Sequence, residues 1–335
     1  MVVICGSAAD WMINKVVHHK GSLHNRITKL IYLKPFTLSE TEQFLKTAHI
    51  TLNRYQIIQL YMVTGGIPHY LKEIKKGKSV ARQLDKMCFS ANGLLKDEFD
   101  KLYASLYDKA DTHIAVIRAL ATKWMGVTRS RILELTGMND GGSLTRILTE
   151  PEQSDFILSV PPFNKKKKDI LYRLVDNYSL FYLKFMEGKR KSGECSFISL
   201  EHTPVWKTWC GYAFENICFM HLQQMKMVMG IAAVYTEAGS YIQKAGNENK
   251  GVQVDMLIDR ADNIINVCEM KFYDAPFTIT KKYAAELRNK RAIVRMVAPS
   301  KRSIFITMVT CFGILENSYA TELIQSQVRA VDLFG

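Results

Sequence analysis

The spacing of hydrophobic positions changes several times along the chain, and each change predicts a different kind of element. The first residues form a short apolar run that stops at Gly6-Ser7, as a buried parallel strand stops at its ligand-facing end. From Ser39, which with Glu42 fits a helix-capping box, to about Tyr107 the spacing is helical. We therefore expect the end of a parallel sheet followed by a set of helices.

The middle of the chain combines short helical segments with a hairpin. The helical segments cover residues 113–125, 128–136 and 143–149 and are separated by turns that contain glycine. Two apolar runs at 156–160 and 170–174 follow, and the loop between them carries four consecutive lysines. This order of elements predicts a winged helix-turn-helix. A polar, basic stretch at 188–193 then marks an expected domain boundary.

Helices and strands alternate in the last part of the chain. Helices are expected around residues 212–227 and 318–324. Strands are expected at 232–236, 252–260, 264–272, 292–298 and 303–310. The alternation predicts a mixed sheet flanked by helices, so the chain as a whole is expected to be an α/β multidomain protein.

Length, charge and cysteines limit the classes of protein that the chain can belong to. Its 335 residues suffice for two or three hydrophobic cores. Lys and Arg outnumber Asp and Glu by 45 to 32, which favours a polyanionic partner such as nucleic acid, although an anionic membrane surface would explain the charge equally well. Seven cysteines without a close pair favour buried free thiols. Because no apolar run approaches the ~20 residues of a membrane span and no signal pattern is present, we expect a cytoplasmic protein without a membrane partner.

A hairpin near the C-terminus is expected to bring acidic side chains together. If the chain folds back around Asp262, Asp255 faces Glu269 on the neighbouring strand. Opposed residues have Cβ atoms about 4.5–5.5 Å apart, and two carboxylates so close repel each other unless a positive charge lies between them. A hard divalent cation is the usual solution. Lys271, on the same face as Glu269, can orient water or stabilise charge on a phosphate, and Glu215 on the preceding helix completes the carboxylate set. An ordinary exposed hairpin face, with Lys271 paired to a carboxylate, is the alternative.

These residues resemble the pattern of the PD-(D/E)xK, or restriction-endonuclease-like, superfamily. The pattern consists of a helical Glu215, then Asp255, then Glu269-Met270-Lys271, with Val254 where the family usually has proline. The resemblance implies a restriction-endonuclease-like mixed α/β domain with Mg²⁺ held by Asp255, Glu269 and Glu215. It further implies phosphodiester hydrolysis, with Asp255, Glu269, Lys271 and Glu215 as the catalytic residues.

Basic and hydroxyl side chains at the starts of two predicted helices make DNA the expected partner. Phosphates are favoured at helix starts, and base edges can be reached from them. The residues are Arg129, Arg131, Ser143 and Arg146, and the hairpin lysines Lys165, Lys166, Lys167 and Lys168 would meet the backbone of an adjacent groove. Winged helices also serve as protein-docking modules, so this alternative stays open.

Four short motifs in the first seventy residues resemble the second half of an archaeal-type ATPase of the AAA+/STAND class. They are the runs at residues 3–7, 23–26, 33–36 and 64–68. The resemblance implies a partial ATPase sheet strand and a helical lid. Within it, Ser7 would be the sensor, Arg26 would lie near the γ-phosphate or a subunit boundary, and Pro68 would touch adenine. Self-association is expected on the same basis.

The resemblance divides the chain into four expected segments. Residues 1–35 would be a remnant of the AAA+/STAND core, 36–107 the lid, 108–190 the winged helix-turn-helix and 191–335 the PD-(D/E)xK nuclease-like domain. A phosphate-cradling Gly-x4-Gly-Lys-Ser/Thr loop is absent, since Lys72 stands where its first glycine should be. We therefore expect ATP to bind only in a full-length relative, with residue 1 partway through an ancestral ATPase domain.

The expected function is that of the C-terminal portion of an AAA+/STAND-type ATPase-family protein that binds DNA and carries a Mg²⁺-dependent nuclease domain. ATP hydrolysis is not expected of the chain as given, because it lacks both the loop lysine and the acid that holds Mg²⁺. Two alternatives remain. One is a non-catalytic DNA-binding or regulatory module with a degenerate nuclease fold, and the other is an ATPase whose missing half is supplied by a longer gene product.

Overall fold

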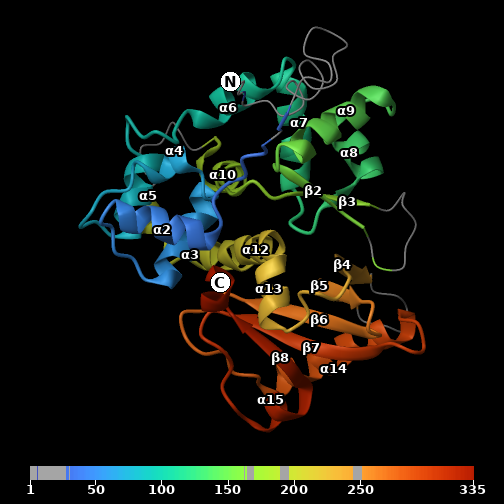
Figure 1. The fold of residues 1–335 in the computed structure, drawn as a ribbon. Helices are drawn as coiled ribbons and strands as arrows, with labels where there is room; N and C mark the ends of the chain where they lie inside the picture. The colour runs from blue at the N-terminus through green and yellow to red at the C-terminus, as the bar shows by residue number, and fades with distance from the viewer. Residues whose placement is uncertain are drawn as a thin grey trace.

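The computed structural model describes most of the chain as two lobes, one largely helical and one built on a five-stranded sheet (Figure 1). The described residues are 6, 28–29, 31–161, 163, 170–188, 196–243 and 251–335. Several expected features lie outside them, namely the strand before Gly6, the sensor Ser7, Arg26, the hairpin lysines Lys165, Lys166, Lys167 and Lys168, and most of the stretch at 188–193.

The helical lobe starts with a short series of helices, as the helical spacing predicts. They are α2 (Leu38–Thr47), α3 (Arg54–Thr64), α4 (Pro68–Leu71), α5 (Val80–Cys88) and α6 (Glu98–Leu106). The N-cap of α2 is Thr37, whose Oγ1 accepts from the N–H of Glu40 while the Glu40 carboxylate accepts from the N–H of Thr37. The capping box expected at Ser39 and Glu42 is therefore wrong by two residues. The reason is that Leu38, which is completely buried, already belongs to the helix.

Three helices and a small antiparallel sheet form the rest of the helical lobe. The helices are α7 (Ala110–Ala121), α8 (Arg129–Thr136) and α9 (Gly142–Gln153), and the strands are β1 (Val127–Thr128), β2 (Ile157–Val160) and β3 (Leu171–Leu174). The strands pair in the order β1-β3-β2. After them come α10 (Asn177–Phe181), the π-helical turn η3 (Tyr182–Met186) and α11 (Phe197–Leu200). The sequence predicts α7, α8, α9, β2 and β3 to within a few residues, whereas β1 and α11 are not expected from it.

The second lobe is a mixed sheet with the strand order β4-β5-β6-β7-β8. Its strands are β4 (Thr236–Gln243), β5 (Val252–Arg260), β6 (Ile264–Lys271), β7 (Ser303–Thr310) and β8 (Ile324–Arg329). The first three pair antiparallel, and β7 and β8 continue in parallel with β6. The mixed α/β character expected from the sequence is therefore present.

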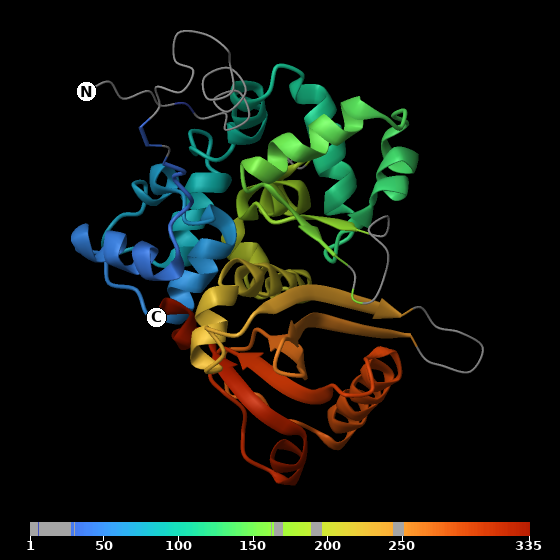
Figure 2. The same cartoon turned by 45° about the vertical axis from the view of Figure 1, so that its right-hand side comes forward.

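Helices cover both faces of this sheet. Helices α12 (Pro204–Met220) and α13 (Leu222–Val228) lie between the sheet and the helical lobe, while α14 (Lys281–Val297) and α15 (Ser318–Leu323) lie on the opposite face (Figure 2). Buried side chains of β5 and β6 alternate accordingly. Met256 and Cys268 belong to the core shared with α12, whereas Val267 packs against Val294 of α14. Among the helices that the structure describes, none is both long and apolar enough to cross a bilayer.

Two expected strands of this lobe differ from the structure, and one expected helix ends a residue early. Residues 292–298 are expected as a strand because Ile293 and Val294 are β-branched, but they mostly complete α14, in which Ala284, Leu287 and Val294 form one buried helical stripe. The strand expected at 232–236 begins only at its last residue, as β4. Ile324, expected to end a helix, is instead the first residue of β8. Tertiary packing overrides local preference at these positions.

The two lobes share one hydrophobic core. The closing 3-10 helix η4 (Ala330–Phe334) contacts α2 and α3, and buried residues from Leu38 to Phe334 belong to the same cluster. Arg54 of α3 strengthens this contact, because it donates to the carbonyl of Val331 at 3.1 Å and lies over the ring of Phe334. The segment boundaries expected from the sequence stay predictions, since this core runs across them.

The cysteines that the structure describes are buried free thiols, as the sequence predicts. They are Cys88, Cys210, Cys218, Cys268 and Cys311. Burial raises the pKa of the Cys311 thiol to about 12, so the thiol stays protonated and unreactive.

Candidate acidic centre

Strands β5 and β6 pair in the register that the sequence predicts for Asp255 and Glu269. Asp259 faces Ile265 and Met256 faces Cys268, so one further step along the same ladder brings Asp255 beside Glu269. The regular ladder ends at that step. At the same level the pairing of β5 with β4 shifts register around Ser240, which is typical of a β-bulge. Bulges redirect side chains and are common beside functional sites.

Asp255 is fixed against β6 by a backbone contact. Its carboxylate is 6% exposed, and Oδ2 accepts from the N–H of Met270 at 2.9 Å. Met270 lies between Glu269 and Lys271 in the sequence, so this bond holds the carboxylate beside both side chains. Oxygen ligands in a rigid setting are what a hard divalent cation requires.

Glu269 is completely buried and is held by two side chains of α14. Lys290 donates from Nζ to Oε1 at 2.6 Å, and Tyr283 donates from its hydroxyl to Oε2 at 3.0 Å. Lys271 lies further away, with Nζ 3.7 Å from Oε2. Lys290 and Tyr283 are absent from the sequence-based site because no element is expected over residues 273–291, where the structure has most of α14. Their spacing of seven residues, two turns on one face of a helix, is the signal that could have found them.

Glu215 lies on α12 and meets an arginine from the small sheet. Arg173 of β3 is completely buried, and its Nη2 lies 3.4 Å from Oε2 of Glu215. The Nε of Arg173 also donates to Oδ1 of Asn216, and the guanidinium lies over the ring of Phe219. Within the described residues, Nη1 of Arg173 has no hydrogen-bond partner. Arg173 therefore links the small sheet directly to the acidic centre, and sequence analysis does not find it because a lone arginine in a strand carries no pattern.

The charges of the centre act on one another. Burial first, and then the charge of Asp255, raise the pKa of Glu215 to about 8 against the opposing effects of Arg173 and Lys271. Burial and Asp255 also raise the pKa of Glu269. Burial by itself would lower the pKa of Lys271, but the three neighbouring carboxylates outweigh it and the pKa rises. The structure thus brings the four predicted residues into one electrostatic cluster.

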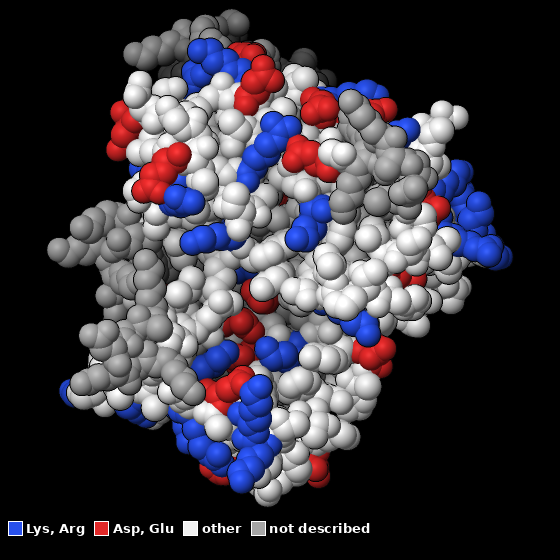
Figure 3. Space-filling view, turned by 180° about the vertical axis from the view of Figure 1, so that it is seen from behind, with Lys and Arg blue, Asp and Glu red and all other residues white. Residues whose placement is uncertain are grey.

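A cleft of about 730 Å³ opens from this cluster between α3, α12 and the end of β6. Glu215 and Lys271 line its inner part, and the polar side chains Gln59, Glu201 and Lys207 lie around them. Asp255 and Glu269 are not among the lining residues. Acidic and basic side chains lie close together on the face seen in Figure 3. The centre is therefore reached through Glu215 and Lys271.

A metal site made of three carboxylates stays a prediction. In the part of the chain that the structure describes, no three or more His, Cys, Asp or Glu side chains are grouped as a metal ion would need. Both oxygens of Glu269 are engaged by Lys290 and Tyr283. Mg²⁺, however, is usually held by one or two carboxylates and keeps several waters. Asp255 and Glu215, which repel each other, fit such a two-carboxylate site.

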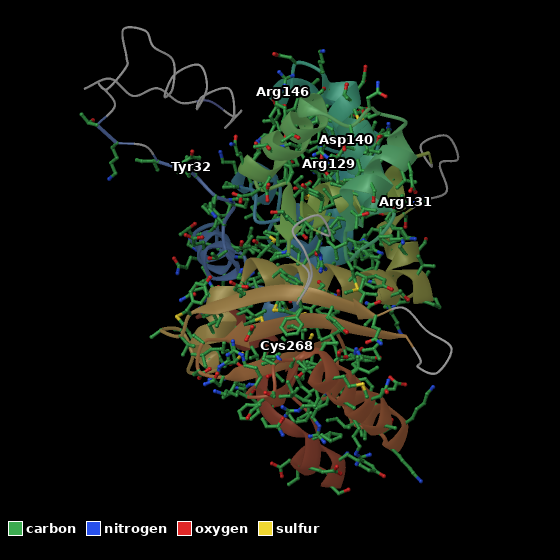
Figure 4. All side chains as sticks on the ribbon, turned by 90° about the vertical axis from the view of Figure 1, so that its right-hand side faces the viewer. Tyr32, Arg129, Arg131, Asp140, Arg146 and Cys268 are labelled. Carbon is green, nitrogen blue, oxygen red and sulfur yellow. The ribbon has the colours of Figure 1, made fainter. Side chains whose placement is uncertain are left out.

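The arginines expected to contact DNA are paired with acids of their own helices or turns. Arg129 lies 2.7 Å from Asp140, and the two are labelled in Figure 4 on α8 and in the turn before α9. Arg131 pairs with Glu134 and Arg146 with Glu150. Ser143 is exposed, and the N-cap of α9 is Gly141, without a side-chain cap. Part of the basic charge on these helices is therefore neutralised within the chain.

The Gly-Gly-Ile-Pro motif forms the turn between α3 and α4. Pro68 is the first residue of α4 and is half-buried. A side chain at Gly66, whose φ is +72°, would place Cβ 2.2 Å from the carbonyl oxygen of Phe36. The turn therefore requires glycine at this position for steric reasons. The adenine contact expected for Pro68 stays a prediction.

Comparisons with known proteins give one relative in sequence. No protein-family model matches the chain. An uncharacterized protein of Methanocaldococcus jannaschii is 22% identical over 297 residues, which are 88% of this chain and 64% of that protein. The chain thus spans less than two thirds of the length of this relative. A crystal structure of a Vibrio cholerae protein aligns with 74% of this chain and 55% of its own at 10% identity, but its TM-score of 0.28 is too low to support an argument.

Proposed function

We propose that this chain cleaves phosphodiester bonds of nucleic acid at the acidic centre, with Mg²⁺ held by Asp255 and Glu215. One observation carries the proposal. Burial and the charge of Asp255 raise the pKa of the buried Glu215 carboxyl, and Lys271 lines the same open cleft as Glu215. When bound, such a cation polarises a phosphate and activates water.

The side chains of the centre have separate roles in this proposal. Glu215, whose pKa is about 8, gives up its proton when it becomes a ligand. Lys271 reaches the cleft, where its Nζ donates to a phosphate oxygen and stabilises the negative charge that develops there. Glu269 acts as a positioning residue, because Lys290 and Tyr283 engage both of its carboxylate oxygens and Lys271 lies 3.7 Å from it.

The helical lobe supports nucleic acid as the substrate. The order of α7, α8, α9 and the sheet β1-β3-β2 resembles that expected of a winged helix-turn-helix, a module that places a helix in the major groove. Arg173 of β3 joins this sheet to Glu215.

A cleavage assay on the full chain tests the proposal. Labelled single-stranded and duplex DNA and RNA are incubated with Mg²⁺ or with EDTA. The wild type is expected to cut only with Mg²⁺, and Asp255→Asn or Lys271→Met to slow cleavage by about 10²–10³. Glu316→Gln, an exposed site on the same lobe, serves as the matched control and should cut normally. Cleavage that persists in Asp255→Asn, or no cleavage by the wild type on any substrate, contradicts the proposal.

A second candidate is a nucleic-acid-binding module in which the nuclease fold no longer cuts. The contact of Lys290 with Glu269 favours it, because an ammonium group already provides positive charge where the family would place a cation. This candidate predicts nucleic-acid binding that is unchanged by Mg²⁺ and by Asp255→Asn. Cation binding that depends on Asp255 would exclude it.

We also propose kinship with the C-terminal portion of AAA+/STAND ATPases. The order of α7 to β3, which resembles that expected of a winged helix, supports it. Reading the genomic sequence upstream of Met1 for Gly-x4-Gly-Lys-Ser/Thr tests this kinship. Finding the loop supports it, and an upstream region without any such loop argues against it.

A further inference from the structure

The cleft beside the acidic centre has walls of a distinct chemistry. Aromatic rings from three elements line it, and several of them are fixed by their neighbours. Tyr55 of α3 stacks on Phe272 with ring centroids 4.9 Å apart and planes at 9°, and Tyr212 of α12 stacks on Trp124 at 5.0 Å and 9°. Tyr273, which follows β6, is 54% exposed. Rings that are already ordered lose little freedom when a further planar group stacks on them.

Amide side chains stand beside these rings. Asn53, Gln56 and Gln59 line the α3 side of the cleft. Asn53 and Gln56 also cap the start of α3 with each other, which fixes their orientation. Amides can donate to and accept from the edges of any nucleobase. The rings of the cleft can therefore stack on the face of a planar, polar ligand, and its amides can form hydrogen bonds with the ligand's edges.

The size of the cleft suits unpaired nucleotides. Its volume of about 730 Å³ lies within the range of sites for small organic ligands, about 300–1,000 Å³. A base inside a duplex must leave its stack to enter a pocket of this size, whereas a base of a single strand enters without that cost. A strand whose bases lie in the cleft is therefore unpaired there.

The charge of the cleft is nearly balanced. Its lysines are Lys207 and Lys271, and its carboxylates are Glu201, Asp274 and Glu215. Two lysines therefore face three carboxylates, and the cleft carries no excess of positive charge. Affinity for a strand here must come from stacking and hydrogen bonds more than from phosphate contacts, so it should depend only weakly on salt.

We propose that this cleft binds an unpaired segment of nucleic acid, its bases stacked on the exposed rings, and that single-stranded nucleic acid is therefore the substrate class of the acidic centre. Binding of the unpaired segment in the cleft does not depend on the proposed function. The assignment of the substrate class rests on it. Tyr273 is the ring most open to a base, since more than half of its surface is exposed.

Binding in EDTA tests the proposal without any cleavage. Fluorescence anisotropy of the full chain is measured with a short labelled oligothymidine and with the same oligonucleotide in a duplex. The strand is expected to bind more tightly than the duplex. Tyr273→Ala is expected to weaken strand binding about tenfold, while Tyr273→Phe, which keeps the ring, binds as the wild type does. Tyr235→Ala removes another exposed ring outside the cleft and should have no effect.

The outcomes separate this proposal from the cleavage proposal. A Tyr273→Ala variant with wild-type affinity for the strand overturns the cleft as the strand site. Strand binding that depends on Tyr273, without cleavage on addition of Mg²⁺, removes the nuclease function and leaves the cleft assignment intact. Cleavage of duplex but not of single strands supports the nuclease function and rules out single-stranded nucleic acid as its substrate class. A thermal melt of Tyr273→Ala shows whether the variant is folded, and Tyr273→Phe carries the comparison if it is not.

Discussion

Lys290 on α14 donates from Nζ to Oε1 of Glu269 at 2.6 Å, and the carboxylate that it meets is completely buried. Tyr283, on the same face of α14, donates to the other oxygen. A buried carboxylate without a partner is costly, so these two contacts keep Glu269 in place. In the proposed mechanism Glu269 therefore positions other groups, and Asp255 and Glu215 would hold the cation.

Removing Lys290 should free Glu269 as a ligand. Lys290→Met is expected to lower stability without cation by roughly 3–5 kcal/mol, because a buried charge loses its partner. It is also expected to tighten Mn²⁺ binding about tenfold, equivalent to about 1.4 kcal/mol, since a third carboxylate joins the site. Calorimetric titration measures the affinity, with the exposed Lys282→Met on the same helix as control. An unchanged affinity would mean that Glu269 does not face the cation.

Arg173 should be one of the most sensitive positions in the chain. Arg173→Met leaves Glu215 and Asn216 without their buried partner, so it is expected to cost roughly 3–5 kcal/mol of unfolding free energy. Arg118, which pairs with Glu187 and is half exposed, offers a matched comparison, and Arg118→Met should cost less than about 1 kcal/mol. Chemical denaturation measures both. Equal losses of unfolding free energy in the two variants would show that the buried contact of Arg173 adds no stability.

Stability should fall as pH rises between about 4.5 and 8. Burial and the charge of Asp255 raise the pKa of Glu215 from 4.5 to about 8, so in this window the folded state holds a proton that the unfolded state has released. Above about pH 8 both states have lost it and the slope levels off. Glu215→Gln should remove most of this fall in melting temperature with pH. A wild-type slope in the variant would mean that a group other than Glu215 causes it. Cation affinity should rise over the same window because the proton competes with the cation.

Asp140 limits the charge that α8 presents. Its carboxylate lies 2.7 Å from Arg129 (Figure 4). Asp140→Asn should free this guanidinium for a phosphate, tighten duplex binding and steepen the dependence of log K on log salt by about one unit. Asp108→Asn, at an exposed site before α7, removes the same charge without freeing Arg129. Equal changes in duplex affinity for the two variants would mean that only the net charge of the chain determines this affinity.

Much of the second lobe follows from its sequence because local signals agree with packing there. The turn residues around Asp262 and the alternation in β5 and β6 predict the register that the structure has. This register is what brings Asp255 and Glu269 together. The helix that carries Glu215 is also predicted, although its start at Pro204 is earlier than the apolar spacing suggests.

The remaining parts depend on contacts that are distant in sequence. Arg173 and Glu215 are 42 residues apart, and nothing local to either indicates that they meet. Lys290 lies on a helix whose last turns contain Ile293 and Val294, residues that favour strands in isolation. The cleft likewise requires α3 to pack beside α12, a contact made through the shared core. The periodicity of the sequence predicts single helices and strands. It does not predict these contacts, because they form between elements that are distant in the sequence.

Calorimetric titration of Mg²⁺ into the wild type and Asp255→Asn tests the acidic centre most directly. Asp262→Asn, in the exposed turn of the same hairpin, is the matched control. The wild type and the control are expected to bind one Mg²⁺ ion per chain with release of a proton near pH 7, and Asp255→Asn is expected to show no binding heat. Identical titrations for wild type and Asp255→Asn would contradict the account.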